Sequence, residues 1–398
     1  MNTDTTASWT AAFRSAVISP YEDIELLPLR AFSAQTVRQI IRLDGGGSAL
    51  RIRLSNRYGS APLHIGGARL ARRTEGSGIE SGSDTPLRVD GAEEFTVPAG
   101  EDIVTDPVEQ TVAAGDELAV SLWLPSDTGL TTYSLVPLRT GYAVPGNALA
   151  ATTLDGAEGL EELDTRHFIS GADVLAPAGT AIAVAFGDSW FEGNGTTPDT
   201  DHRFPDLLNN RLREAASGTT TGLVDWVVNQ GLSANRLLTD EVGEHALARL
   251  RRDVLDVPGV THVLVHFGLN DLGIPGQEAH PASAPIPSAT DLIAGLTTLA
   301  ERLHAAGLTA IATTLGPYKD TVYDGYATPE GLAIGREVSD WIRSADSPFD
   351  AYVDFDVVAD PADPDRIRDD YDSGDGLHVN DAGAQALADA VDLASLKV

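Results

Sequence analysis

Apolar positions along the chain follow two different patterns, and the change falls near residue 176. In residues 36–42 and 50–54, apolar and polar side chains alternate, which is typical of strands with one solvated face. Later apolar runs, such as Ala181 to Phe186, do not alternate and predict strands covered on both faces, as in a parallel sheet. We therefore expect a jelly-roll-like antiparallel β-sandwich over residues 1–175 and an α/β domain over residues 176–398.

Turn residues divide the N-terminal half into short strands. Further strands are predicted at 63–65, 94–97 and 117–124, and no convincing amphipathic helix interrupts them. The glycine cluster Gly45–Gly47 predicts a hairpin-like connection between the first two runs. The stretch Gly146–Gly159, rich in Gly, Ala and Asp, predicts a poorly constrained surface loop.

Predicted strands and helices alternate along the C-terminal half. Strands are predicted at 181–186, 224–228, 262–267, 309–314 and 352–355. Between the third and fourth, apolar residues from Leu292 to Leu303 recur at helical spacing, and Gly307 is a candidate C-cap. Another helix should begin near Asn380. This order predicts a doubly wound, mostly parallel sheet.

Composition excludes several classes of partner. The net charge is −32, and an acidic surface repels nucleic-acid phosphates and anionic membranes, so neutral substrates are favoured. A salt-rich habitat and a simple codon bias both explain this acidity. The chain has no cysteine and no apolar run long enough to span a membrane.

The N-terminal residues show no secretory signal. Residues 1–20 hold one basic residue and no continuous apolar stretch. We expect a cytoplasmic protein from the chain as given, or a secreted one if a leader has been removed. Nothing in the sequence specifies an oligomeric state.

A serine follows directly after the first buried strand of the C-terminal half. Gly187, Asp188 and Ser189 place it at the carboxyl edge of the sheet, where open α/β sheets bind ligands. Asp375 and His378 stand three positions apart just before the last helix, so one turn could present a base and the carboxylate that orients it. Each motif alone has a structural reading, a turn for the first and a helix cap for the second.

Two further blocks follow the next two predicted strands at the same edge. Gly231 presents an unobstructed backbone N–H, and the Asn270 amide is an uncharged donor. With the N–H of Ser189 they would form a three-donor oxyanion hole. As structural residues they would be caps and turns.

Together and in this order, the four blocks resemble those of the SGNH or GDSL hydrolase family. The resemblance extends from about Ala181 to the C-terminus and implies a flavodoxin-like three-layer α/β/α domain that hydrolyses esters without a cofactor. It assigns Ser189 as nucleophile, His378 as base, Asp375 as its orienting carboxylate, and Gly231, Asn270 and the Ser189 N–H as oxyanion donors. The N-terminal half resembles the β-sandwich that precedes this domain in some actinobacterial members.

The residues after the serine depart from the family pattern. Trp190 stands where an aliphatic residue is usual, and Phe191 follows it. These rings could wall a small acyl site or stack on a sugar, or pack against the first helix. Asn235 is a third candidate substrate contact. Ala234 replaces a glycine often found in the second block, a position we do not expect to be catalytic.

Metal binding is not predicted. His262 and His266 share one strand face without an evident third ligand, so we interpret them as core or edge residues. The run Asp360–Asp375 has calcium-like spacings but lacks the downstream glutamate of an EF-hand, which favours a solvated acidic loop.

These observations predict a serine esterase that acts through an acyl-enzyme. By analogy we favour a short acyl group, acetyl in particular, on a carbohydrate, and expect a small-molecule or carbohydrate ester as the partner. A lipase, thioesterase or acyltransferase would use the same residues on another acyl chain. An inactive carbohydrate-binding protein is the remaining alternative.

Overall fold

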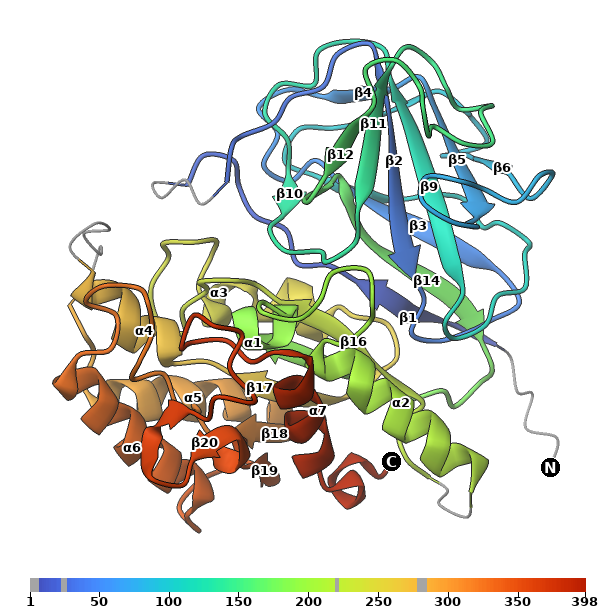
Figure 1. Cartoon of the computed structure of the whole chain (residues 1–398). Helices are drawn as coiled ribbons and strands as arrows, with labels where there is room; N and C mark the ends of the chain where they lie inside the picture. The colour runs from blue at the N-terminus through green and yellow to red at the C-terminus, as the bar shows by residue number, and fades with distance from the viewer. Residues whose placement is uncertain (1–6, 23–26, 219–221, 278–284) are drawn as a thin grey trace, which may run out of the picture. The chain divides into compact units, whose positions relative to one another are not determined.

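The computed structural model describes residues 7–22, 27–218, 222–277 and 285–398. The chain forms two compact units, Met1–Thr180 and Ala181–Val398, which Figure 1 colours from blue to green and from green to red. Each unit has its own buried apolar core.

Two antiparallel sheets make up most of the N-terminal unit (Figure 1). The larger sheet has the order β12-β11-β2-β9-β5-β6, and the smaller has the order β1-β14-β3-β8. Two separate two-stranded ladders, β4-β7 and β10-β13, complete the unit. The strands are β1 Ser8–Arg14, β2 Gln35–Arg42, β3 Leu50–Ser55, β4 Leu63–Ile65, β5 Gly67–Arg72, β6 Thr85–Leu87, β7 Phe95–Val97, β8 Asp102–Val104, β9 Glu117–Leu124, β10 Tyr133–Ser134, β11 Gly141–Pro145, β12 Glu161–Leu163, β13 Arg166–His167 and β14 Ile169–Ala176. The predicted antiparallel sandwich is confirmed, and the described residues of this unit contain no helix.

The glycine cluster does not connect a hairpin, so that prediction was wrong. β2 belongs to the larger sheet and β3 to the smaller, and Gly45–Gly47 carries the chain from one sheet to the other. A β-carbon at Gly46 would lie 2.6 Å from the carbonyl oxygen of Val112, and one at Gly47 would lie 2.6 Å from that of Leu175. The glycines are therefore needed because neighbouring backbone passes close by.

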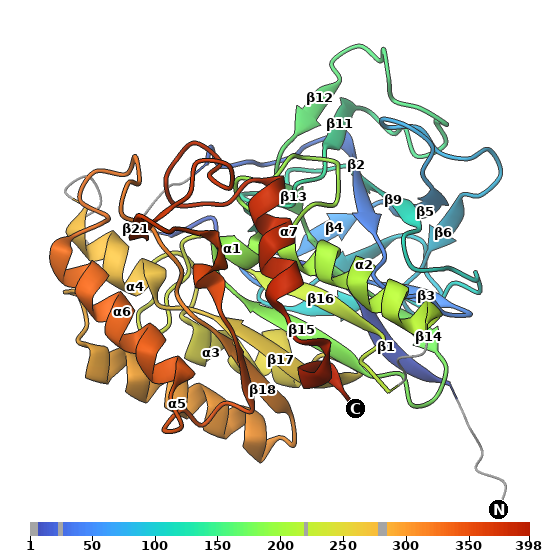
Figure 2. The same cartoon turned by 60° about the horizontal axis from the view of Figure 1, so that its bottom comes forward.

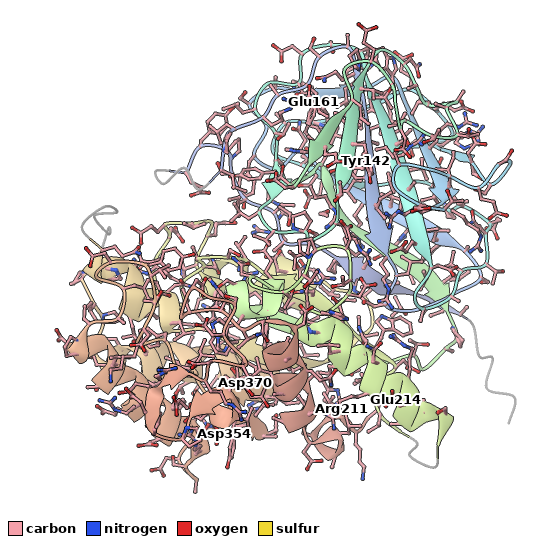
Figure 3. All side chains as sticks on the ribbon, in the orientation of Figure 1. Tyr142, Glu161, Arg211, Glu214, Asp354 and Asp370 are labelled. Carbon is pink, nitrogen blue, oxygen red and sulfur yellow. The ribbon has the colours of Figure 1, made fainter. Side chains whose placement is uncertain are left out.

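The Gly146–Gly159 segment is better anchored than its composition suggested. Leu154 is 1% exposed and packs in a cluster on the larger sheet with Ile40, Ala119, Tyr142 and Val144. Figure 3 labels Tyr142 on β11. The expectation of a poorly constrained loop was wrong because one leucine is enough to anchor the segment to the core.

The C-terminal unit is built on a five-stranded sheet in which every pairing is parallel. Its order is β16-β15-β17-β18-β19, the order of flavodoxin-like folds. The strands are β15 Ile182–Gly187, β16 Trp226–Gly231, β17 Val260–His266, β18 Thr309–Thr313 and β19 Ala351–Val353. Each overlaps a strand predicted from the sequence, and the predicted doubly wound fold is confirmed.

Helices cover both faces of this sheet (Figure 2). On one face, α2 Phe204–Ser217 packs against α7 Asp381–Ala390. Arg211 of α2, labelled in Figure 3, donates to the carbonyls of Ala388 and Val391 where α7 ends. On the other face lie α3 Ala246–Leu250, α5 Ala289–Ala305 and α6 Pro329–Arg343.

Both helices singled out in the sequence are present. In α5, residues from Leu292 to Leu303 face the core, and Gly307 lies just beyond its end with φ of 76°. Asn380 caps α7 by accepting the N–H groups of Ala382 and Gly383. The shorter elements are α1 Ser189–Glu192, α4 Leu269–Gly273, β20 Ala359–Asp360 and β21 Asp363–Ile367, the π-helical turn Arg251–Leu255, and the 3₁₀ turns Ile274–Gly276, Phe355–Val358 and Leu393–Leu396.

Strand order fixes where a site can form. The chain order reverses around β15, and open α/β sheets bind ligands at the carboxyl ends of strands beside such a reversal. β15 and β17 lead into Ser189 and Asn270, respectively, and Gly231 is the last residue of β16. Among the described residues, no helix has both the length and the apolar composition needed to cross a membrane.

Candidate active site

The strand-to-helix turn after β15 presents a serine. Asp188 caps α1, with its side chain accepting the N–H of Trp190 at 3.1 Å, and Ser189 is the first helical residue. A β-carbon at Gly187 would lie 2.7 Å from the Phe191 ring, so the turn needs glycine there. The Ser189 N–H points out of the first turn of α1, and no described residue accepts it.

The loop before α7 brings a base to this serine. Nε2 of His378 lies 2.9 Å from Oγ of Ser189, and Nδ1 of His378 lies 2.6 Å from Oδ2 of Asp375. Because Asp375 accepts from Nδ1–H, Nε2 is left as an acceptor for the serine hydroxyl proton. The three residues predicted from the sequence thus form one continuous hydrogen-bonded chain.

Asp375 is held as an anion. Its Oδ1 accepts the N–H groups of Leu377 at 2.9 Å and His378 at 2.8 Å, and the Ser373 hydroxyl at 3.1 Å. Partial burial alone would raise the pKa of Asp375, but the hydrogen bonds and charge of His378 outweigh burial and hold it well below its ordinary value. A charged carboxylate at Nδ1 is what orients an imidazole as a general base.

The Asn270 amide lies behind the nucleophile. Its Nδ2 is 3.1 Å from the carbonyl oxygen of Asn235 and 3.3 Å from Oδ2 of Asp188. Its Oδ1 accepts the hydroxyl of Tyr326 at 2.9 Å. The N–H that makes the longer contact, to Asp188, is the one that could instead donate a hydrogen bond to a developing oxyanion.

Gly231 does not present a free donor. Its N–H already donates to Oδ1 of Asn229 at 2.8 Å, inside the last residues of β16. A β-carbon at Gly231 would lie 2.2 Å from the backbone nitrogen of Glu192, which explains the glycine by close packing. Its expected role as an oxyanion donor is therefore not supported.

Ala234 replaces Gly231 as the candidate, and sequence reasoning missed it. Its φ of 59° is left-handed, a conformation that favours glycine, and no described residue accepts its N–H. The side chain of Glu192 holds this loop, because its Oε2 accepts the N–H of Ser233 at 2.6 Å. The available signal was the glycine usual at this position, which indicates a left-handed backbone.

A profile of the GDSL-like lipase/acylhydrolase family matches residues 185–386. The chain belongs to this family. It is accordingly a carboxylic ester hydrolase with the SGNH fold.

Solved structures similar to this hydrolase share little sequence with it. A GDSL-like lipase from Bacteroides thetaiotaomicron is 15% identical, with a TM-score of 0.40 over 54% of this chain and 88% of that one. A carbohydrate acetylesterase from Sinorhizobium meliloti is 13% identical, with a TM-score of 0.36 over 52% and 94%. A family two carbohydrate esterase from Cellvibrio japonicus is 11% identical, with a TM-score of 0.34 over 97% and 95%. No curated protein matches the chain.

The side chains after the nucleophile are part of the hydrolase core. Trp190 is 3% exposed and stacks on Phe355 with ring centroids 5.7 Å apart. Phe191 is 0% exposed and stacks on Phe204 at 5.0 Å. This packing supports the alternative that Trp190 and Phe191 pack in the core, and a contact of either residue with substrate stays a prediction.

Asn235 is also a structural residue. It is fully buried, its Nδ2 donates to the carbonyls of Val242 and Glu244, and its Oδ1 accepts from Nε of Arg249 at 2.9 Å. Every polar atom of the side chain is thus engaged within the core. The carbonyl oxygen of Asn235 lies beside the Asn270 amide, and the expected substrate contact of its side chain stays a prediction.

Three buried titratable groups lie under the turn that carries Ser189. Burial raises the pKa of Asp188 to about 8, against the opposing hydrogen bond from Trp190. Burial also raises the pKa of Asp271 to about 6, although the N–H groups of Leu237 and Leu238 counteract it. Burial lowers the pKa of His266 to about 3, so this imidazole is neutral.

The residues considered for metal binding have other partners. On β17, Nε2 of His262 lies 3.0 Å from the carbonyl oxygen of Lys397, and Nδ1 of His266 lies 2.6 Å from Oγ1 of Thr313. Carboxylates of the Asp360–Asp375 run pair with nearby cations, as Asp370 does with Arg368. Within the described ranges, no three His, Asp or Glu side chains converge as metal ligands.

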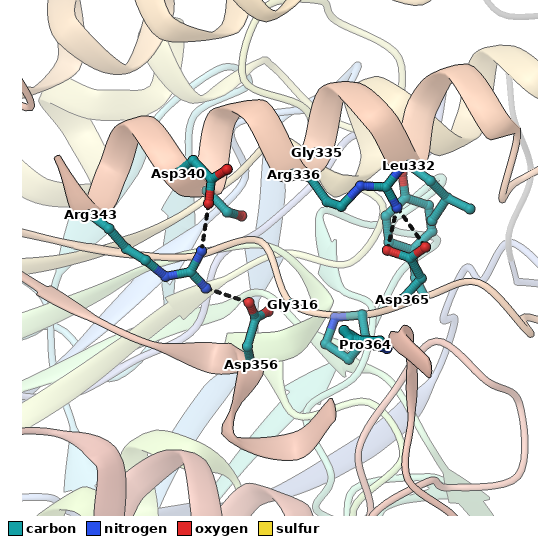
Figure 4. A pocket seen from close by; sticks show the side chains of 12 residues that line it. Gly316, Leu332, Gly335, Arg336, Asp340, Arg343, Asp356, Pro364 and Asp365 are labelled. Atoms are coloured by element: carbon teal, nitrogen blue, oxygen red, sulfur yellow. Dashed lines mark hydrogen bonds and ion pairs between the residues drawn. The ribbon is translucent and has the colours of Figure 1, made fainter. Parts of the chain in front are cut away.

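A cavity of about 150 Å³ lies beside α6, apart from the triad. Figure 4 shows that its arginines are already engaged with carboxylates. Arg336 pairs with Asp365 at 2.5 Å, and Arg343 pairs with Asp340 at 3.3 Å and with Asp356. Because carboxylates that line the cavity neutralise both arginines, the cavity does not favour binding of an anion.

Proposed function

We propose that the hydrolase cleaves short-chain carboxylic esters, acetyl esters of neutral carbohydrates in particular, through a Ser189 acyl-enzyme. The observation that carries the mechanism is the chain of two short contacts, 2.9 Å from Ser189 to His378 and 2.6 Å from His378 to Asp375. This geometry activates a serine hydroxyl at neutral pH without a cofactor.

Each proton and electron pair has a place in this mechanism. Oγ of Ser189 attacks the ester carbonyl carbon while Nε2 of His378 takes the hydroxyl proton. The carbonyl oxygen becomes an oxyanion, for which we propose the N–H of Ser189, the N–H of Ala234 and Nδ2 of Asn270 as donors. The oxyanion then collapses back to a carbonyl, the bond from the carbonyl carbon to the alcohol oxygen breaks, and His378 gives its proton to that oxygen, which leaves the acyl group on Ser189. Water repeats the sequence, releasing the acid and restoring the serine.

Two features favour a short acyl group and a sugar alcohol. The rings of Trp190 and Phe191, directly after the nucleophile, are buried and stacked on Phe355 and Phe204, and we take this packing to favour a short acyl group over a long one. Tyr323 is 42% exposed and interacts with Asp375, so an aromatic ring stands near the triad where a sugar could stack. The net charge of −32 also favours a neutral substrate over an anionic one.

The test compares p-nitrophenyl acetate, butyrate and octanoate with an acetylated xylo-oligosaccharide, in the wild type and in Ser189→Ala. We expect the highest kcat/KM on acetyl esters, release of acetate from the sugar, and a fall in kcat of about 10⁴-fold or more in the variant. A preference for octanoate would indicate a lipase or thioesterase. Acyl transfer to an added alcohol would indicate an acyltransferase, and activity unchanged in Ser189→Ala would overturn the mechanism.

A further inference from the structure

The Asn270 amide has a second neighbour that no family motif marks. Tyr326 lies in the segment between β18 and α6, more than 50 positions further along the chain. Its hydroxyl donates to Oδ1 of Asn270 at 2.9 Å, and its side chain is 3% exposed. Among the residues that the structure describes, the hydroxyl has one hydrogen-bond partner, the amide proposed as an oxyanion donor.

The direction of this hydrogen bond follows from what surrounds the amide. Nδ2 of Asn270 faces two acceptors, the carbonyl oxygen of Asn235 and the carboxyl of Asp188. Oδ1 must therefore point the other way, where the Tyr326 hydroxyl meets it as a donor. If the amide turned over, Nδ2 would face the hydroxyl and Oδ1 would face the carbonyl oxygen of Asn235, which can only accept, so the observed orientation is the favoured one.

The Tyr326 ring is held rigidly. A β-carbon at Gly273 of α4 would lie only 2.2 Å from Cζ of Tyr326, so the ring packs directly on that glycine. On its other side the ring of Tyr318 meets it edge-on, with centroids 5.8 Å apart. Burial raises the pKa of Tyr326 well above its ordinary value, so the hydroxyl keeps its proton.

We infer that Tyr326 is a positioning residue of this hydrolase: its hydroxyl fixes the Asn270 amide so that Nδ2 faces the oxyanion. The inference rests on the proposed function, since it assumes that Asn270 stabilises the oxyanion. Because the oxyanion develops in the transition state, loss of this orientation lowers kcat more than it changes KM.

Tyr318 supplies a matched control. It is also a buried tyrosine, it touches the same ring, and its hydroxyl has no hydrogen-bond partner among the described residues. Tyr326→Phe and Tyr318→Phe each delete one hydroxyl from the same cluster. Only the first deletes a contact with the active site.

The experiment measures kcat and KM on p-nitrophenyl acetate for these variants in the full chain, with active sites counted by titration with a fluorophosphonate. We expect Tyr326→Phe to lower kcat by about 10-fold to 100-fold with KM within about threefold of the wild type. Tyr318→Phe should keep kcat within about twofold. Counting titrated sites corrects for any misfolded fraction, and thermal unfolding records the stability of each variant.

A double-mutant cycle separates positioning from a general structural role. In an Asn270→Ala background, Tyr326→Phe should cause no further loss, because its partner is gone. An unchanged kcat in Tyr326→Phe, or an undiminished loss in the Asn270→Ala background, would overturn the inference. If Ser189→Ala abolishes turnover while Tyr326→Phe does not affect it, the proposed function stands and only this inference fails.

Discussion

Each unit buries an aspartate completely, and the two aspartates have opposite electrostatic environments. In the sandwich, Asp173 accepts from Arg14 at 2.6 Å, Arg51 at 3.0 Å and Arg53 at 2.8 Å. Burial alone would raise the pKa of Asp173, but the charges and hydrogen bonds of Arg14 and Arg53 outweigh it and lower the pKa. In the hydrolase unit, burial dominates at Asp188 and raises its pKa to about 8.

The partners of Asp188 explain the difference. It meets the N–H of Trp190 and the amide of Asn270, which are neutral donors, and Nε2 of His266 lies 3.6 Å away. His266 cannot supply a charge because burial lowers its own pKa to about 3. A buried carboxylate surrounded by opposite charges stays ionised, whereas the buried acid with neutral partners lies next to the nucleophile.

The largest effect that tests this comparison is expected at Asp173. Asp173→Asn keeps the shape of the side chain but leaves Arg14, which is 5% exposed, without its counter-ion. Removing one partner of a buried ion pair costs about 3–5 kcal/mol, so urea denaturation at pH 7 should show the sandwich unfolding at a clearly lower midpoint. Asp84→Asn is the control, because its pair with Arg69 is partly exposed and worth at most about 1 kcal/mol. Equal losses in the two variants would contradict the comparison.

A smaller effect is expected at Asp188, and its dependence on pH has the opposite sign to that at Asp173. Its folded-state pKa of about 8 lies above the ordinary 3.8, so between these values the folded protein binds a proton that the unfolded chain has released. Stability is then lost as the pH rises through this window, by at most ~1.4 kcal/mol per unit. Asp188→Asn cannot ionise, and from pH 6 to pH 8 it should lose about 2–3 kcal/mol less stability than the wild type.

The measurement is the free energy of unfolding at several pH values for both aspartate variants. The lowered pKa of Asp173 gives the opposite sign, since its contribution is present above the ordinary pKa and disappears as the pH falls below it. Asp173→Asn should therefore keep the loss of stability between pH 6 and pH 8. A wild-type stability that does not change across this window would show that Asp188 is ionised in the folded protein.

Sequence patterns predicted the features that depend on local order. Strands β9 and β18, helix α5 and the cap at Asn380 follow from apolar period and turn residues, which act over a few positions. Ser189, His378 and Asp375 were found because motifs at strand ends meet at one edge of a parallel sheet. The hairpin at Gly45–Gly47 failed because the choice of sheet depends on partners far along the chain.

Features that depend on tertiary contacts could not be predicted in this way. The N–H of Gly231 donates to the side chain of Asn229. Trp190 and Phe191 pack on Phe355 and Phe204, contacts that sequence spacing does not predict. Tyr326 carries no motif and reaches Asn270 only through the folded chain. Local sequence specifies which backbone is exposed at the sheet edge, while tertiary packing decides which donors are free.

The smallest effect concerns backbone strain, and it can be measured in both units with one substitution. Ala234 in the hydrolase unit and Ala34 in the sandwich have φ of 59° and 50°, respectively. Glycine removes a left-handed cost of roughly 1–2 kcal/mol but adds unfolded-state entropy of roughly 0.5–1 kcal/mol. Ala234→Gly and Ala34→Gly should therefore each stabilise the protein by roughly 0.5–1 kcal/mol, measured by urea denaturation.

Because glycine keeps the N–H, kcat of Ala234→Gly should stay within about threefold of the wild type. If Ala34→Gly stabilised while Ala234→Gly destabilised, the Ala234 methyl group would be making packing contacts that outweigh its backbone strain. The loop that contains Ala234 would then be stabilised by packing rather than strained.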